Sequence, residues 1–239
     1  MEKNIYSHIL TGNLKKETNK WFEEYADNIA VIEGEREISY KKLGALINCC
    51  RNFFSEQGIR KGDNVAIHME NHIEFIVVFL SLVTMGAVPI LILPAQKKNE
   101  ICGIVKVANP ELYIYDADIS VWDSLNTDSN KSIKAIEKKV FTAMMDGAGK
   151  MQQNMESYDE EILPEDLAFL LLSGGTTGIP KLIPRKHGDY LYNVEKISER
   201  LELTQECVYL SVLPMAHNFA LGNPGILGVF HSGGHCCHM

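Results

Sequence analysis

A short stretch in the second half of the chain carries the residue types that bind phosphate. Residues 173–181 read SGGTTGIPK, directly after the apolar run LAFLLL. Glycines let a backbone turn tightly and approach an anion, while hydroxyls and an ammonium group donate to phosphate oxygens. The glycines are Gly174, Gly175 and Gly178, and the donors are Ser173, Thr176, Thr177 and Lys181. The stretch therefore predicts a phosphate-binding loop that follows a buried strand.

The most familiar phosphate loop, the Walker sequence G-x-x-x-x-G-K-[ST], does not fit this stretch. Ile179 and Pro180 separate the last glycine from Lys181. Leu182 stands at the position of the hydroxyl that would hold magnesium. The spacing excludes a loop of the Walker type.

The same nine positions resemble the phosphate loop of the adenylate-forming superfamily, which contains acyl- and aryl-CoA synthetases, luciferases and nonribosomal adenylation domains. The resemblance implies that residues 173–178 and Lys181 hold the β- and γ-phosphates of ATP, which is used with Mg²⁺, during attack by a carboxylate. Lys181 is then also a catalytic residue. The implied fold is α/β, with parallel-rich sheets and flanking helices.

A second stretch, residues 209–234, narrows the resemblance. Its sequence YLSVLPMAHNFALGNPGILGVFHSGG is similar to the substrate-pocket segment of stand-alone aryl acid–AMP ligases. These enzymes load siderophore and related pathways with 2,3-dihydroxybenzoate or salicylate. The runs KLIPRKHGDYLYNV and ILPAQKKNE resemble the same subgroup, and the similarity is patchy only between residues 116 and 159.

Three consecutive residues of this segment correspond to pocket residues of the subgroup. His217 corresponds to the residue that opens the pocket and lies near the acyl-adenylate, and we expect it to act in catalysis. Asn218 corresponds to the amide that binds the ring substituent ortho to the carboxylate. An amide suits this role because it both donates and accepts hydrogen bonds. Phe219 corresponds to the aromatic wall, which suits a planar ring by stacking.

Two positions depart from the subgroup's pattern. Asn223 stands where a small Ser or Cys usually forms the pocket floor, Gly222 precedes it, and Ala220 replaces a common proline. An asparagine adds volume and hydrogen-bonding capacity where ring substituents are sorted. The acid could therefore be 3-hydroxypicolinate, an aminobenzoate or a smaller benzoate instead of the two usual substrates.

Strand and helix patterns alternate along the chain and must position these residues. We expect a helix, a short hairpin and a second helix over residues 13–58, and then strand, helix, strand, helix, strand up to residue 116. Such alternation indicates parallel strands joined by crossovers. After the phosphate loop we expect helices from Asp189 and over residues 223–234, with strands in CVYLSVLP and HCCHM.

Residues 116–159 lose this pattern and predict an irregular segment. The chain as a whole, residues 1–239, corresponds to an incomplete amino-terminal large adenylation domain, because the adenine, ribose, hinge and catalytic-lysine motifs and the carboxy-terminal domain of the family are absent. The chain alone is then expected to be inactive as a ligase. A non-catalytic or split-enzyme binding module, and an aryl-CoA ligase, remain as alternatives.

Histidines and cysteines near the carboxy end suggest zinc at first sight. The run HSGGHCCHM holds five potential ligands, but successive side chains of a strand point to opposite faces. Four of them cannot meet one ion, so no metal site is expected. The six cysteines include two adjacent pairs, which favours reduced thiols and a cytoplasmic protein over a disulfide framework.

Charge and hydropathy limit the partners. The formal net charge is −8, no run is rich in lysine and arginine, and no uninterrupted apolar stretch reaches the length of a membrane span. We therefore expect neither nucleic acid nor membrane as a partner. The resemblance instead implies an aryl carboxylic acid, and as acceptor an aryl carrier protein or CoA.

Overall fold

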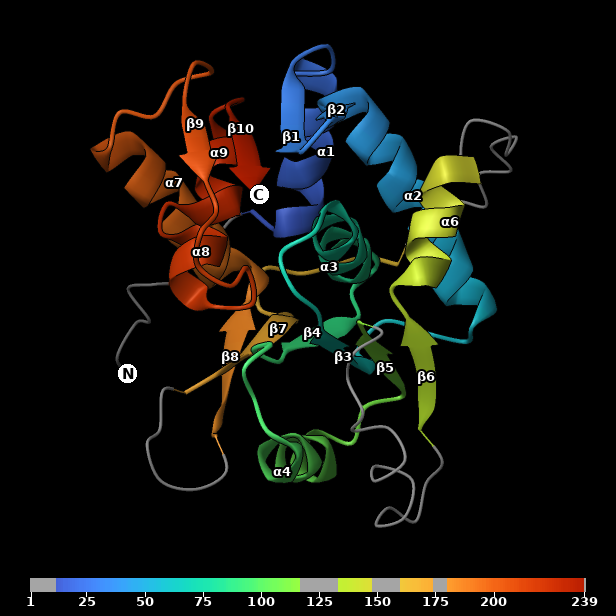
Figure 1. Ribbon diagram of the computed structural model, residues 1–239. Coiled ribbons are helices and arrows are strands. Elements are labelled where there is room, and N and C mark those ends of the chain that lie inside the picture. Colours follow the sequence, from blue (N-terminus) through green and yellow to red (C-terminus); the bar gives the residue numbers. More distant parts are fainter. Residues whose placement is uncertain (1–11, 117–132, 148–159, 174–179, 239) are drawn as a thin grey trace, which may run out of the picture.

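Two sheets and the helices packed between and around them make up the protein in the computed structural model, which describes residues 12–116, 133–147, 160–173 and 180–238 (Figure 1). The strands are β1 (Ile29–Glu33), β2 (Arg36–Ser39), β3 (Asn64–His68), β4 (Val88–Leu91), β5 (Leu112–Tyr115), β6 (Lys134–Glu137), β7 (Leu167–Leu172), β8 (Leu182–Lys186), β9 (Val208–Leu210) and β10 (His235–His238). The helices are α1 (Leu14–Glu24), α2 (Tyr40–Glu56), α3 (Ile73–Met85), α4 (Lys98–Ala108), α6 (Lys139–Gly147), α7 (His187–Arg200), α8 (Asn218–Gly222) and α9 (Gly225–His231).

The larger sheet has the strand order β6-β5-β3-β4-β7-β8. All neighbours are parallel except β7 and β8, which form an antiparallel pair at one edge. Side chains alternate between its two faces: Val65 and Ile67 join the main core, whereas Ala66 joins the cluster that contains Ile104 of α4. Helices α3 and α4 lie on opposite sides of this sheet in Figure 1. The predicted α/β class with parallel crossovers is confirmed.

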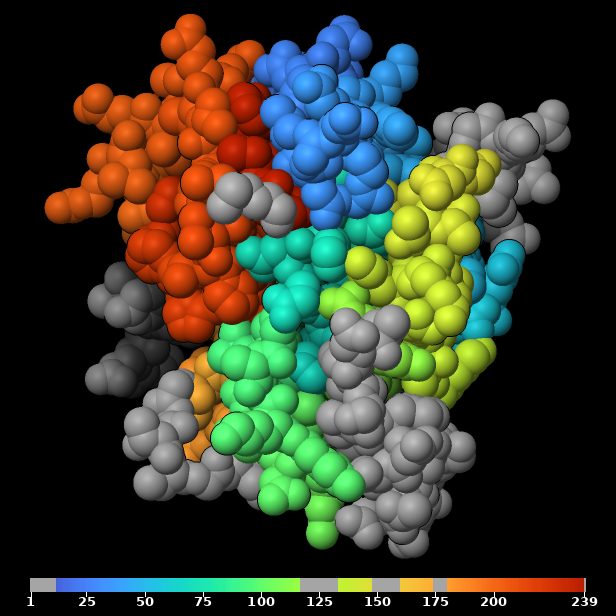
Figure 2. All heavy atoms as spheres, in the orientation of Figure 1, coloured from blue at the N-terminus to red at the C-terminus, as the bar shows by residue number. Residues whose placement is uncertain are grey.

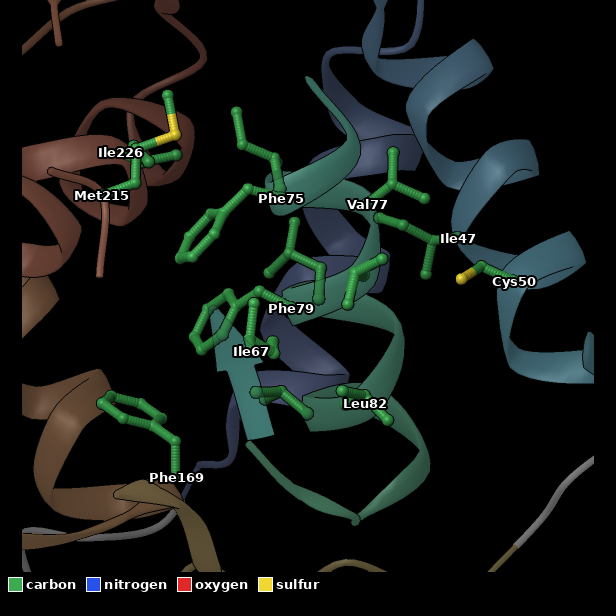
Figure 3. Packing of buried hydrophobic residues seen from close by; sticks show 14 of the residues in the cluster. Ile47, Cys50, Ile67, Phe75, Val77, Phe79, Leu82, Phe169, Met215 and Ile226 are labelled. Atoms are coloured by element: carbon green, nitrogen blue, oxygen red, sulfur yellow. The ribbon is translucent and has the colours of Figure 1, made fainter. Parts of the chain in front are cut away.

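Helix α3 is the centre of the core. Each of its thirteen residues is buried, as expected for a helix that is apolar all round and packs on every side. Phe75 and Phe79 of α3 stack with ring centroids 6.2 Å apart, and Phe79 meets Phe169 of β7 edge to face at 5.4 Å. Figure 3 shows these rings beside Met215 and Ile226 of the carboxy-terminal part. The core thus joins the larger sheet to the later elements.

The smaller sheet has the order β2-β1-β10-β9. β10 pairs in parallel with β1 and with β9, so among the described strands the first lies next to the last. Figure 2 shows the same contact as blue amino-terminal atoms against red carboxy-terminal ones. All six cysteines are free thiols. In the described part of the chain, no helix is both long and apolar enough to cross a lipid bilayer.

The structure differs from the sequence-based expectation between residues 116 and 159. Instead of a wholly irregular segment, it contains strand β6 and helix α6, and β6 extends the sheet beside β5. Residues 117–132 and 148–159 lie outside the described residues. The buried pair Phe141 and Met145, four positions apart, is the helical signal within this stretch.

The bounds of β8 and α3 also bear on the site. The run LIPRK forms β8, although Pro184 interrupts its strand pattern; β8 is an edge strand, where a missing backbone donor is tolerated. Helix α3 begins after His72, whose side chain makes no capping hydrogen bond. The Asn71 side chain is used elsewhere, as described below.

Candidate functional site

The two ends of the predicted phosphate loop are fastened to each other. The backbone N–H of Ser173 donates to the carbonyl of Lys181 at 2.9 Å, and the Ser173 hydroxyl accepts from the Lys181 N–H at 2.9 Å. The antiparallel pairing of β7 and β8 therefore continues up to Ser173 and Lys181, the two ends of the predicted loop. Lys181 is exposed. Residues 174–179 lie outside the described residues, so the roles of Gly174, Gly175, Thr176, Thr177 and Gly178 stay predictions.

His217 directly precedes the short helix α8. Its Nδ1 accepts a hydrogen bond from the backbone N–H of Phe219 at 3.2 Å, which makes His217 the cap of this helix. A nitrogen that accepts carries no proton, so the neutral imidazole has its proton on Nε2. Because His217 is exposed, Nε2 is the atom that can donate to a ligand.

Asn218 is held by a tyrosine from the neighbouring helix. The hydroxyl of Tyr190 donates to Oδ1 of Asn218 at 3.2 Å. Burial raises the pKa of Tyr190, so its phenol stays protonated and remains a donor. With Oδ1 engaged, Nδ2 of the same amide has no hydrogen-bond partner within the described residues and can donate outward.

Tyr190 itself is fixed by its surroundings. Its ring packs edge to face on Phe169 of β7 with centroids 4.6 Å apart, and the Arg185 guanidinium lies 5.0 Å from the ring centroid. On the other side, α8 approaches so closely that a Cβ on Gly222 would lie 2.5 Å from the Tyr190 hydroxyl oxygen. Asn193 of α7 also donates to the Gly222 carbonyl at 2.9 Å. The sequence alone assigns no function to Tyr190. Its position in the run KLIPRKHGDYLYNV is the only sequence feature that points to this residue.

The other two predicted pocket residues lie on the same helix. Phe219 is 49% exposed, and Asn223 is half-buried at the carboxy-terminal cap of α8, where its N–H donates to the Phe219 carbonyl at 3.2 Å. Within the described residues, the Asn223 side chain makes no hydrogen bond. The structure thus brings all four predicted pocket residues onto α8 and its caps; that they line an acid-binding pocket stays a prediction.

The loop that leads into α8 is held by a residue that sequence reasoning missed. Nδ2 of Asn71 donates to the carbonyls of Ser211 at 3.2 Å and Leu213 at 2.9 Å. Oδ1 of Asn71 accepts from the N–H of Met215 at 2.7 Å. Three hydrogen bonds from one amide thereby fix residues 211–215, which directly precede the candidate pocket.

Comparisons with known proteins agree with this architecture. Residues 18–239 match the family of AMP-binding enzymes. Enterobactin synthase component E of Escherichia coli K12 is 34% identical over 215 residues, which make up 87% of this chain and 40% of that protein. The 2,3-dihydroxybenzoate-AMP ligase of Bacillus subtilis 168 is 34% identical over 221 residues, again 40% of its length. The chain thus spans about 40% of these curated relatives.

A solved structure has the same fold. The apo structure of Mycobacterium smegmatis MbtA superimposes with a TM-score of 0.82 at 28% sequence identity. The match covers 97% of this chain and 44% of that one.

Proposed function

Because the chain belongs to the AMP-binding enzyme family, we propose that it is part of an enzyme that activates an aryl carboxylic acid as its adenylate. The observation that carries this proposal is the amide of Asn218, whose Oδ1 is held by Tyr190 and whose Nδ2 can donate outward. An exposed aromatic ring, Phe219, follows it directly. A donor beside an aromatic face suits a planar acid with a polar ortho substituent. One relative is a 2,3-dihydroxybenzoate-AMP ligase, which supports this substrate class.

In the proposed reaction, a carboxylate oxygen of the acid attacks the α-phosphorus of ATP and forms the acyl-adenylate bond. The bond from the α-phosphorus to the bridging oxygen breaks, and pyrophosphate leaves with the electron pair. Lys181 and the loop donors would neutralise charge on the departing group, and Mg²⁺ arriving with ATP would add to this. The step needs no covalent protein nucleophile.

The residues present fit a bound ATP with its Mg²⁺. Ser173 and Lys181, at the two ends of the Gly- and Thr-rich stretch, are hydrogen-bonded to each other, and Lys181 is exposed. His217 would donate through Nε2 to an oxygen of the bound adenylate. Transfer of the acyl group to a carrier-protein thiol or to CoA would follow. Free thiols at all six cysteines suit an enzyme of the cytoplasm.

The test uses the complete enzyme that contains this chain. Aryl-acid-dependent exchange of pyrophosphate into ATP should be measured with 2,3-dihydroxybenzoate and salicylate, for wild type and Lys181→Ala. We expect the variant to lose on the order of 100-fold in exchange rate while acid binding changes little, because the charge acts where the phosphates separate.

The matched control is Lys196→Ala, which removes an equally charged side chain from the surface of α7. It should leave exchange unchanged. Equal losses of acid affinity and exchange rate in Lys181→Ala would contradict the assigned role. Absence of exchange with every aryl acid in the wild type would contradict the proposed activity.

A further inference from the structure

Three potential metal ligands from three separate elements meet at one end of the smaller sheet. Glu33 ends β1, His72 precedes α3, and His238 ends β10. Nδ1 of His72 lies 2.9 Å and Nε2 of His238 lies 3.0 Å from the same oxygen, Oε1 of Glu33. All three ligand atoms lie within 4.8 Å of one another.

These separations are close to those of a coordinated ion. Bonds of about 2.0–2.1 Å in tetrahedral geometry place neighbouring ligand atoms roughly 3.3 Å apart. Two of the observed separations are a few tenths of an ångström shorter, so small side-chain shifts would accommodate an ion. Two imidazoles and one carboxylate are also a donor set that Zn²⁺ and similar ions accept.

His238 has no satisfactory partner without such an ion. Its side chain is 1% exposed, and neither ring nitrogen has a hydrogen-bond partner within the described residues. Nε2 is near the Glu33 carboxylate, but the contact lacks the alignment of a hydrogen bond. Buried polar atoms are normally paired, so this ring requires an explanation.

The charges around the cluster favour a cation. Glu33 and Glu74 are two carboxylates, and both contact the single guanidinium of Arg36. With neutral imidazoles, one negative charge is left over. Arg36 would orient Glu33 from the second coordination shell, as such partners commonly do.

An ion could reach the cluster from solvent. The His72 side chain is 29% exposed and borders a hollow of about 360 Å³ between residues 70–72 and residues 210–214. Three protein ligands leave a fourth position, which water from this hollow could fill. The sequence argument against zinc still holds for one strand, since side chains of β10 alternate between its faces. The partners of His238, however, come from β1 and from the residue before α3.

We propose that Glu33, His72 and His238 bind one divalent transition-metal ion, with Zn²⁺ as the best match. The ion would tie β1, β10 and the start of α3 together. Such a role is structural and independent of adenylate chemistry, because none of the three residues belongs to the candidate pocket.

The rival interpretation is an ion-pair cluster in which one imidazole carries the balancing positive charge. Metal titration separates the two. The chelator-treated protein should be titrated with Zn²⁺ by calorimetry and with Co²⁺ by visible absorption. We expect one ion per chain, a visible band typical of low-coordinate Co²⁺, and a rise in melting temperature with Zn²⁺.

Variants test the ligands one at a time. His72→Ala and His238→Leu should each weaken Zn²⁺ binding by at least about 100-fold, since even changes outside the first coordination shell commonly cost 10- to 100-fold. His235→Leu and Cys237→Ser, on the same strand, are the controls and should bind as wild type does. Circular dichroism checks that each variant folds, and His72, half-buried and before the helix, is the variant least able to disturb the fold.

Two outcomes would overturn the metal site. One is the absence of saturable binding in the folded wild-type protein, which would leave only the ion-pair cluster. The other is binding that survives in His72→Ala but is lost in Cys237→Ser, which would assign the ion to the thiols. Neither outcome depends on ATP or on an aryl acid, so the proposed function is unaffected by them.

Discussion

The hydroxyl of Tyr190 donates to Oδ1 of Asn218 over 3.2 Å, and this hydrogen bond connects the candidate pocket to the core. Tyr190 packs on Phe169 of the larger sheet, and Phe169 packs on Phe79 of the buried helix α3. The orientation of one exposed amide is therefore set by a row of aromatic rings that reaches the centre of the molecule. Fixed orientation matters because the two ends of an amide have opposite hydrogen-bonding roles.

We predict that Tyr190→Phe in the complete enzyme lowers kcat/KM for ortho-hydroxylated acids by about 2- to 12-fold, the value of one hydrogen bond of roughly 0.5–1.5 kcal/mol. The ring remains, so stability should change little. The KM of the acid should rise, whereas the KM of ATP should not change. Tyr192→Phe, on the exposed side of α7, is the control. Equal effects on benzoate, which lacks the ortho group, would contradict a role through Asn218.

Asn71 should stabilise the loop before α8. Asn71→Ala removes three hydrogen bonds to Ser211, Leu213 and Met215, and we expect the free energy of unfolding to fall by about 2–3 kcal/mol. Urea-induced unfolding measures this. Asn71→Asp keeps the shape and the acceptor but loses both donors, and should lie between wild type and Asn71→Ala.

The control for Asn71→Ala is Asn48→Ala, because Asn48 is exposed and its one described hydrogen bond, from Arg51, lies at the surface. A change within about 0.5 kcal/mol is expected there. In the complete enzyme, Asn71→Ala should also raise the KM of the acid, since the loop positions His217 and Asn218. Unchanged stability of Asn71→Ala would show that these contacts are not maintained in solution.

His187 should make the protein sensitive to mild acid. The residue is fully buried, neither ring nitrogen has a hydrogen-bond partner in the described part of the chain, and burial lowers its pKa from 6.5 to about 4. The unfolded chain therefore binds a proton between pH 6.5 and 4 that the folded chain does not. The contribution of neutral His187 to the free energy of unfolding is fully present above pH 6.5. It is lost as the pH falls toward 4, by about 3 kcal/mol in all.

Replacing the imidazole should remove this dependence. We expect the unfolding free energy of His187→Leu, measured in urea at pH 8.5, 7.5, 6, 5 and 4, to fall less steeply with decreasing pH than that of wild type. Above pH 7 the difference between the two proteins should be constant, which serves as the internal control. Parallel curves down to pH 4 would mean that His187 is protonated in the folded state.

Much of the fold follows from local patterns in the sequence. The apolar runs of β3, β4 and β7 predict the observed strands, and the pair Asn109-Pro110 predicts the observed end of α4. The family inferred from SGGTTGIPK is confirmed. Alternation of helices and strands correctly predicts a parallel sheet. These features are local or periodic, which is why one sequence suffices to find them.

The contacts that complete the site are not local. Tyr190 and Asn218 are 28 positions apart, Asn71 and Met215 are 144 apart, and Glu33 meets His238 across paired strands. Nothing in the spacing of these residues relates them, since only the topology brings them together. A short edge strand such as β8 is likewise hidden by Pro184, because the sequence does not say that the strand lies at an edge.

The last prediction concerns Asn223, one of the two positions at which the sequence is expected to depart from the pocket of the aryl acid–AMP ligases. Asn223 is half-buried at the end of α8, and its side chain makes no hydrogen bond within the described residues. If it faces the ring of the acid, its amide needs a partner on the substrate, since an unpaired buried polar group costs roughly 1–3 kcal/mol. The preferred acid should then carry a hydrogen-bonding group on that side of the ring.

Substitution in the complete enzyme tests this preference. Asn223→Ser should shift selectivity toward 2,3-dihydroxybenzoate and Asn223→Cys toward salicylate, each on the order of tenfold to a hundredfold in kcat/KM, because the smaller side chains relieve the crowding and remove the unpaired amide. Asn218→Ala is the matched comparison and should impair every ortho-substituted acid alike, since it removes the donor they share. A panel of benzoates, aminobenzoates and 3-hydroxypicolinate that ranks identically in wild type and both Asn223 variants would show that Asn223 does not face the ring.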